Sequence, residues 1–193
     1  MPSRRLSLAT CFILLAGAMA LTRVNHFSAI PDASWAVFMV AGYLLRGQFR
    51  WAFPLLMAVA VVVDYLVISR AGLDFWSHYC VSPGYWFLLP AHLSLWLAGS
   101  WLASRQTPLG LRSAQFAAAL VGGVVLCHLF AQGGFYWFSS SVAEPSVAGW
   151  WKNYTDWLWP YFRTTAMYVL PLALLEAARL GLRRSRALDL SVR

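Results

Sequence analysis

Six long apolar runs divide this chain of 193 residues and leave only short polar connections between them. A helix that crosses a bilayer needs about 20 predominantly apolar residues, because the hydrocarbon core is about 30 Å thick. We therefore predict an all-α integral membrane protein whose residues 1–193 form a single domain of six transmembrane helices. The expected helices are 6–24, 33–45, 51–69, 83–103, 113–138 and 157–182.

The composition agrees with a membrane location and argues against a nucleic-acid partner. Hydrophobic residues make up 60% of the chain and charged residues 11%, whereas soluble domains are about half apolar and about one quarter charged. The net charge of +8 comes from arginines between the apolar runs, which is a topology signal and not a basic binding face. The sequence also lacks the GxxxxGK[ST], HExxH and GxSxG motifs of common enzyme classes.

The positive charges are distributed unevenly over the two sides of a six-pass arrangement. One side has only Arg23, Arg70 and Lys152 in its connections. Cytoplasmic loops carry an excess of Lys and Arg, so the other side, with both termini, is expected to be cytoplasmic. The arginines on the expected cytoplasmic side are Arg4, Arg5, Arg46, Arg50, Arg105, Arg112, Arg179, Arg183, Arg184, Arg186 and Arg193. The outer connections are then 25–32, 70–82 and 139–156.

The first apolar run has a second interpretation. Arg4 and Arg5, an apolar stretch and then Ala18-Met19-Ala20 resemble a cleavable signal peptide. Cleavage would leave five helices with the C-terminal arginines still in the cytoplasm, so the charge distribution does not decide between the two. We expect the first helix to be retained.

The second outer connection carries the most informative residues. Residues 71–85 combine several aromatic side chains with His78 and Cys80. Thiols on the outer side of a membrane normally form disulfides, but Cys11 and Cys127 lie within apolar runs. Cys80 is therefore a candidate reactive thiol or metal ligand. The alternative is an inert thiol that packs as a small hydrophobic group.

Polar and aromatic residues gather near the expected outer surface. His26, Asp64, His92, His128 and Gln132 lie at similar depths, and ionisable groups at membrane depth usually face a cavity or pair with one another. Each histidine could instead make one structural hydrogen bond between helices. The outer aromatic residues suit a large flat ligand, although an interfacial aromatic belt explains part of the excess. They include Trp76, Tyr79, Tyr85, Trp137 and Tyr154.

These features resemble a known family of vitamin transporters. The six-helix layout is similar to the substrate-binding (S) component of energy-coupling-factor (ECF) transporters. The loop Ser77-His78-Tyr79-Cys80 before Pro83-Gly84-Tyr85 resembles the BtuM family of cobalamin transporters. Asn25-His26-Phe27 and Asp64-Tyr65 add to this resemblance, which extends over the whole chain.

The resemblance implies a corrinoid transporter of the bacterial inner membrane. Its substrate would be cobalamin or cobinamide, bound at the outer face with the Cys80 thiolate on cobalt, and no ECF energising module is expected. The thiolate would also favour removal of the upper cobalt ligand, for example decyanation, as a side activity. The expected ligand-binding residues are His26, Asp64, Trp76, His78, Tyr79, Tyr85, Trp137 and Tyr154.

Two other functions are compatible with the sequence. His92 and His128 lie at matching depths on successive helices and could be the axial ligands of a b-type haem. A structural membrane subunit without a ligand is the other alternative. The haem alternative leaves the aromatic outer connection and Cys80 unexplained.

Overall fold

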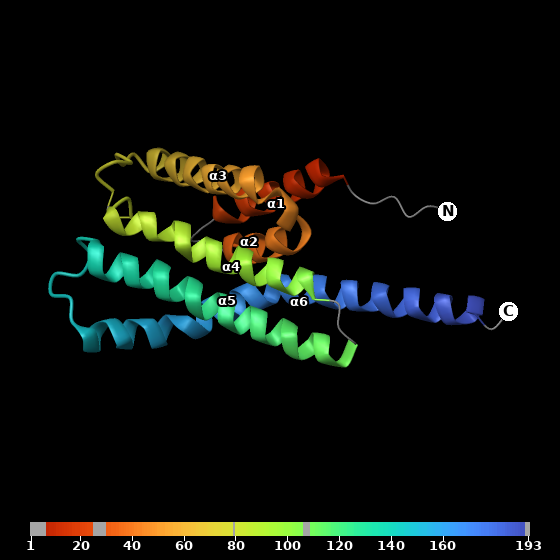
Figure 1. The fold of residues 1–193 in the computed structure, drawn as a ribbon. Helices are drawn as coiled ribbons and strands as arrows, with labels where there is room; N and C mark the ends of the chain where they lie inside the picture. The colour runs from red at the N-terminus through yellow and green to blue at the C-terminus, as the bar shows by residue number, and fades with distance from the viewer. Residues whose placement is uncertain (1–6, 25–29, 79, 106–108, 192–193) are drawn as a thin grey trace.

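The protein is all-helical, as predicted. A computed structural model describes residues 7–24, 30–78, 80–105 and 109–191, and these residues contain no strand (Figure 1). Two 3₁₀ segments accompany the α-helices. In chain order the elements are α1 (Leu8–Arg23), α2 (Ser34–Leu44), η1 (Arg46–Gln48), α3 (Phe49–Arg70), η2 (Pro83–Phe87), α4 (Leu88–Ser104), α5 (Leu109–Phe138) and α6 (Val147–Ser191).

The six α-helices differ in their ability to cross a membrane. Four stretches are long and apolar enough to do so, namely Arg46–Arg70, Pro83–Ser104, Leu111–Phe138 and Val147–Leu182. The other two helices are shorter, with 16 residues in α1 and 11 in α2. At 1.5 Å per residue α2 is about 17 Å long, roughly half of the bilayer hydrocarbon core. The described residues contain six α-helices, and four stretches have the length and apolar character of a membrane span. That all six helices cross a membrane stays a prediction.

The centre of the bundle is a close contact between α2 and α4. Gly42 of α2 lies against the backbone of Trp96, and Gly99 of α4 lies against the backbone of Met39. A side chain at either glycine would overlap the carbonyl oxygen of the facing helix. Ser100 adds a hydrogen bond, since its Oγ donates to the Gly42 carbonyl oxygen at 3.0 Å. We call this contact the α2–α4 seam.

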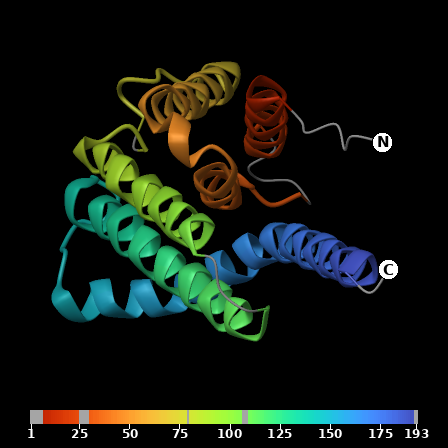
Figure 2. The ribbon, with the colours of Figure 1, turned by 45° about the vertical axis from the view of Figure 1, so that its right-hand side comes forward.

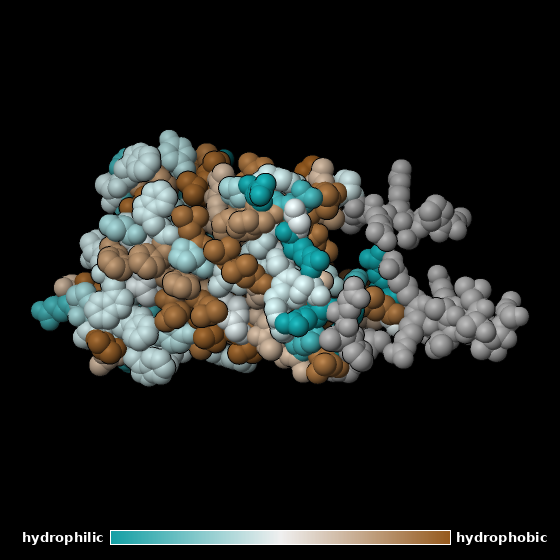
Figure 3. All heavy atoms as spheres, in the orientation of Figure 1, coloured by the Kyte–Doolittle hydropathy of each residue, from teal (hydrophilic) through white to brown (hydrophobic). Residues whose placement is uncertain are grey.

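The connections lie at two opposite ends of the bundle. The beginning of α1, the turn η1, the end of α4, the beginning of α5 and the end of α6 share one end, which we call the terminal end. The link from α3 to η2 and the link from α5 to α6 lie at the opposite end, the loop end (Figure 1). The most hydrophilic side chains on the face in Figure 3 lie mainly toward the terminal end. This arrangement agrees with an even number of passes.

The sixth helix begins earlier than predicted. Residues 147–156 were expected to lie in an outer loop, and that expectation is wrong because α6 starts at Val147. An ion pair between Lys152 and Asp156, one turn apart, supports this first part of the helix. The whole of α6 has 45 residues, which is about 68 Å at helical rise. It includes Pro160 and Pro171, and its two parts run in different directions (Figure 2).

Candidate functional site

A charged hydrogen-bond network joins three helices near the loop end. Arg23, the last residue of α1, binds the carboxylate of Asp64 in α3 with two nitrogens. Its Nε donates to Oδ1 at 2.6 Å and its Nη2 donates to Oδ2 at 2.7 Å. This two-pronged geometry is the strongest kind of arginine–carboxylate pairing. It fixes the end of α1 against the outer part of α3.

Two further elements contribute to the same network. The Arg23 Nη1 donates to Asp32 Oδ2 and to Ser34 Oγ, both at 3.0 Å. The other oxygen of Asp32 accepts hydrogen bonds from Ser34 N and Ser34 Oγ. Tyr85 of η2 donates its hydroxyl proton to Asp64 Oδ2 at 2.6 Å. We call these five residues the Arg23 network.

The Arg23 network is mostly removed from water. The side chains of Arg23, Asp32 and Asp64 are 12%, 20% and 18% exposed. With one arginine and two aspartates, the network has a formal charge of −1. Burying these groups is tolerable because each charge has an opposite charge and several hydrogen bonds beside it. From its sequence position Arg23 counts only as one of the few outer charges, so its role in this network was not predicted.

The connection from α3 to η2 is anchored at its first part. Gly72 has φ of +74° and turns the chain after α3, a conformation that favours glycine. Phe75 is buried, and its ring contacts Tyr65 of α3 and Trp76. Asp74 accepts a hydrogen bond from the Ser77 backbone N–H at 2.8 Å. These contacts anchor residues 72–77 to the end of α3.

Cys80 lies between this anchor and a second one. Its side chain is half-buried, and its backbone N–H donates to His78 Nδ1 at 3.3 Å. Three residues later η2 begins at Pro83. Gly84 lies so close to the carbonyl of Gly134 in α5 that a Cβ there would be 2.5 Å from its oxygen. Cys80 thus lies at the loop end between two packed segments, on the connection that leads into Tyr85.

The two buried histidines of α4 and α5 occupy separate aromatic surroundings. His92 donates from Nδ1 to the Leu88 carbonyl at 2.7 Å, and its ring lies 4.3 Å from that of Phe38. His128 donates from Nε2 to the Tyr154 carbonyl at 2.9 Å and contacts the rings of Trp35 and Tyr161. Both imidazoles therefore make structural hydrogen bonds. In His128 this bond occupies Nε2, a nitrogen that could otherwise bind haem iron.

The predicted site residues fall into separate groups. Asp64 and Tyr85 lie together in the Arg23 network, and His78 contacts Cys80. Trp76 is 78% exposed on the same connection. Trp137 lies near the end of α5, and Tyr154 is turned into the α5–α6 contact, where its hydroxyl donates to the Val125 carbonyl. His26 and Tyr79 lie outside the described residues.

The described residues do not supply a metal site of their own. Within residues 7–24, 30–78, 80–105 and 109–191, no three His, Cys, Asp or Glu side chains lie close enough to hold a metal ion. Any metal at Cys80 would need most of its ligands from elsewhere.

The fold and this site define an all-helical protein with four helices of membrane-spanning length and a polar site at one end. Comparison with known proteins adds no family to that description. No model of a known protein family matches the sequence, and no curated protein matches it as a relative.

Proposed function

We propose that this protein binds a corrinoid, cobalamin or cobinamide, at its loop end and carries it across the bacterial inner membrane. The observation that supports this most directly is the position of Cys80. Its half-buried thiol lies between the anchored residues 72–77 and the packed turn at Gly84, on the connection that leads into Tyr85. A ligand that meets the thiol there also meets polar groups and an exposed indole.

The chemistry of cobalt fits a site with a single protein ligand. A corrin ring supplies the four equatorial nitrogens and leaves two axial positions for other ligands. A thiolate is a soft ligand that suits transition metals, so Cys80 alone suffices to occupy one axial position. The lack of a larger cluster of ligating side chains in the described part of the chain is consistent with this arrangement.

The surroundings of Cys80 suit the rest of a corrinoid. The macrocycle is flat with apolar faces, and Trp76 presents a large exposed ring on the same connection. The edge of the macrocycle carries carboxamides, which both donate and accept hydrogen bonds. Asp64 and Tyr85 are hydrogen-bonded to each other and supply polar groups where the connection that carries Cys80 enters η2. We propose these residues, with His78, as contacts of the bound corrinoid.

The membrane part of the proposal rests on helix length and charge. Four apolar spans and arginines at the terminal end favour a multi-pass protein with both termini in the cytoplasm. A reporter that is active only in the cytoplasm, fused after Arg193, is expected to give a signal. Activity only of a periplasmic reporter would reverse the orientation. Transport would proceed without an ECF energising module, and cytoplasmic enzymes that consume the corrinoid would maintain the direction of flux.

The proposed function is tested by purifying the protein from cells fed cobalamin and recording its visible spectrum. We expect a corrinoid spectrum altered by sulfur coordination. Cys80→Ser is expected to remove the alteration while the protein remains folded, since a serine hydroxyl is a poor ligand for cobalt. Cys11→Ser and Cys127→Ser serve as matched controls. A haem Soret band, or an unchanged spectrum in Cys80→Ser, would contradict the proposal.

A second measurement concerns the lower face of the corrin. If Cys80 occupies the position of the nucleotide base, cobinamide, which lacks that base, is expected to bind at least as tightly as cobalamin in calorimetry. Strict dependence on the base would exclude the thiolate role.

A thiolate on the lower face of cobalt is also expected to weaken the bond between cobalt and a cyanide on the upper face. The cyanide then leaves with the electron pair of that bond, as cyanide ion.

A further inference from the structure

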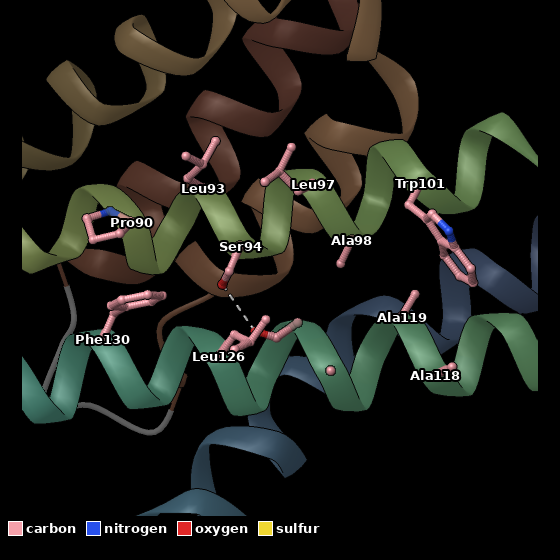
Figure 4. Close-up of a pocket in the computed structure, with 12 residues that line it drawn as sticks. Pro90, Leu93, Ser94, Leu97, Ala98, Trp101, Ala118, Ala119, Leu126 and Phe130 are labelled. Atoms are coloured by element: carbon pink, nitrogen blue, oxygen red, sulfur yellow. Dashed lines mark hydrogen bonds between the residues drawn. The ribbon is translucent and has the colours of Figure 1, made fainter.

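An apolar groove runs along the surface between α4 and α5. It has a volume of about 600 Å³ and is open on one side. Its floor consists of small residues, and its walls carry larger apolar side chains (Figure 4). The lining residues from α4 are Pro90, Leu93, Ser94, Leu97, Ala98 and Trp101, and those from α5 are Ala118, Ala119, Gly122, Gly123, Leu126 and Phe130.

The groove offers few hydrogen bonds to its occupant. Among the described lining residues, the only side chains with a hydrogen-bonding group are Trp101, at the terminal end, and Ser94. Its hydroxyl already donates to the Ala91 carbonyl at 2.7 Å and lies 3.3 Å from the Gly123 carbonyl (Figure 4). The backbone groups beneath are committed to helical hydrogen bonds. An occupant of the groove must therefore be apolar along this length.

The length of the groove matches one leaflet of a bilayer. From Pro90 to Trp101 the chain advances eleven residues of helix, which is about 17 Å at 1.5 Å per residue. One leaflet contributes about half of the 30 Å hydrocarbon core. The groove runs along two of the helices that are long enough to cross a membrane, so it follows the direction of an acyl chain.

The terminal end of the groove carries a positive charge. Arg105 follows α4 directly, and its guanidinium carbon lies 4.9 Å from the centre of the Trp101 ring. Trp101 lines the groove, so this cation–π contact holds the guanidinium at the groove's mouth. An arginine there can pair with a phosphate, while the indole lies where tryptophan is favoured, at the membrane interface.

We propose that this groove is a binding site for one anionic phospholipid of the leaflet at the terminal end, such as phosphatidylglycerol. One acyl chain lies between α4 and α5, and the phosphate pairs with Arg105. The guanidinium at the end of the groove favours an anionic headgroup over an apolar helix of a second copy, and the measurement below distinguishes these two occupants. This inference requires a membrane location and is independent of corrinoid binding.

Gly122 provides a direct test. A Cβ at Gly122 would meet no atom within 4 Å, so Gly122→Leu fills the groove without disturbing the backbone. Gly17 in α1 has the same open surroundings and lies away from the groove, so Gly17→Leu is the matched control. Circular dichroism and gel filtration establish that both variants are folded.

The measurement is native mass spectrometry in detergent with added phosphatidylglycerol or phosphatidylethanolamine that carry identical acyl chains. The wild-type protein and Gly17→Leu are expected to retain one phosphatidylglycerol, and Gly122→Leu to lose at least tenfold in occupancy. Arg105→Gln, which leaves the groove open, is expected to reduce the preference for phosphatidylglycerol about fivefold, since one basic residue near an anionic surface has about that effect.

Three results would overturn the proposal. The first is equal lipid retention by the wild-type protein and Gly122→Leu. The second is equal binding of the two lipids by the wild-type protein, which would show an apolar surface without selectivity for the lipid headgroup. The third is a dimer that disappears in Gly122→Leu, which would assign the groove to a second copy of the chain.

Discussion

The α2–α4 seam and the Arg23 network hold the bundle together by opposite means. In the seam, Gly42 and Gly99 bring two helix backbones into direct contact, and Ser100 adds one neutral hydrogen bond. In the network, Arg23 and Asp64 join α1 and α3 through charged side chains. The first contact depends on the absence of side chains and the second on their presence.

This difference determines which region can change shape. Close backbone packing has no alternative arrangement, because protein interiors are packed nearly as densely as organic crystals. Hydrogen bonds between side chains can be exchanged for bonds to a ligand with little net change in free energy. The seam therefore suits a rigid frame, whereas the Arg23 network suits the part of the molecule that meets a ligand.

The largest effect is expected from a side chain in the seam. Gly99→Leu would place its Cβ against the carbonyl oxygen of Met39, so the helices must separate along their length. We expect a destabilisation of about 3 kcal/mol or more, at or above the usual range for overpacking. Thermal unfolding in detergent, followed by circular dichroism, measures it. Gly122→Leu is the control with open space, and a normal melting temperature for Gly99→Leu would disprove the close contact.

The next largest effect is expected from removing the positive charge of the network. Arg23→Met leaves Asp32 and Asp64 partly buried without their partner. Removing one member of a buried ion pair typically costs about 3–5 kcal/mol, and we expect about 3 kcal/mol here because the groups retain some exposure. The same melting assay measures it. Combining Arg23→Met with Asp64→Asn should restore part of the loss, and a further drop would contradict the pairing.

A smaller effect is expected from the hydroxyl of Tyr85. Tyr85→Phe keeps the ring and removes the hydrogen bond to Asp64. Hydrogen bonds to charged groups contribute about 1.5–3 kcal/mol, and the lower value applies because Arg23 still neutralises the carboxylate. The midpoint of thermal unfolding measures this, and Tyr65→Phe, an exposed tyrosine on α3, is the control. An equal effect of both substitutions would remove the hydroxyl from the network.

The smallest effect is expected from an exposed ion pair. Lys152 and Asp156 lie one turn apart on α6 with side chains 78% and 52% exposed. Such pairs contribute about 0.3–0.5 kcal/mol, so Lys152→Gln should hardly move the melting temperature. A loss comparable to that of Arg23→Met would show that charge alone, and not burial, explains the strength of the Arg23 network.

The helices could be predicted largely from the apolar runs, and the exceptions have physical causes. The predicted run 33–45 agrees with Ser34–Leu44, because Pro31 and Asp32 before it and Arg46 after it interrupt the apolar pattern. The start of α6 was missed because residues 147–156 are too polar to read as a membrane helix. There the side-chain pair Lys152–Asp156 and contacts between aromatic rings stabilise the helix instead.

The pairings of the Arg23 network could not be predicted from the sequence. Asp64 and Tyr85 were named as candidate ligand-binding residues, which stays a prediction, and no spacing in the sequence indicates that Asp64 binds both Arg23 and Tyr85. An arginine at the end of an apolar run could have indicated that a buried acidic partner exists. This signal was not used, because an arginine in an outer connection ordinarily informs only the prediction of membrane topology. Pairings across 41 and 21 residues of chain depend on how helices pack and not on local sequence.

The two prolines of α6 have a consequence for its shape. Proline lacks the backbone N–H that would bond one turn back, so a helix bends away at that point. Pro160 and Pro171 are eleven residues apart, which is close to three full turns at 3.6 residues per turn. The two bends therefore point in nearly the same direction and add together. The axis of α6 is expected to curve to one side, within a single plane.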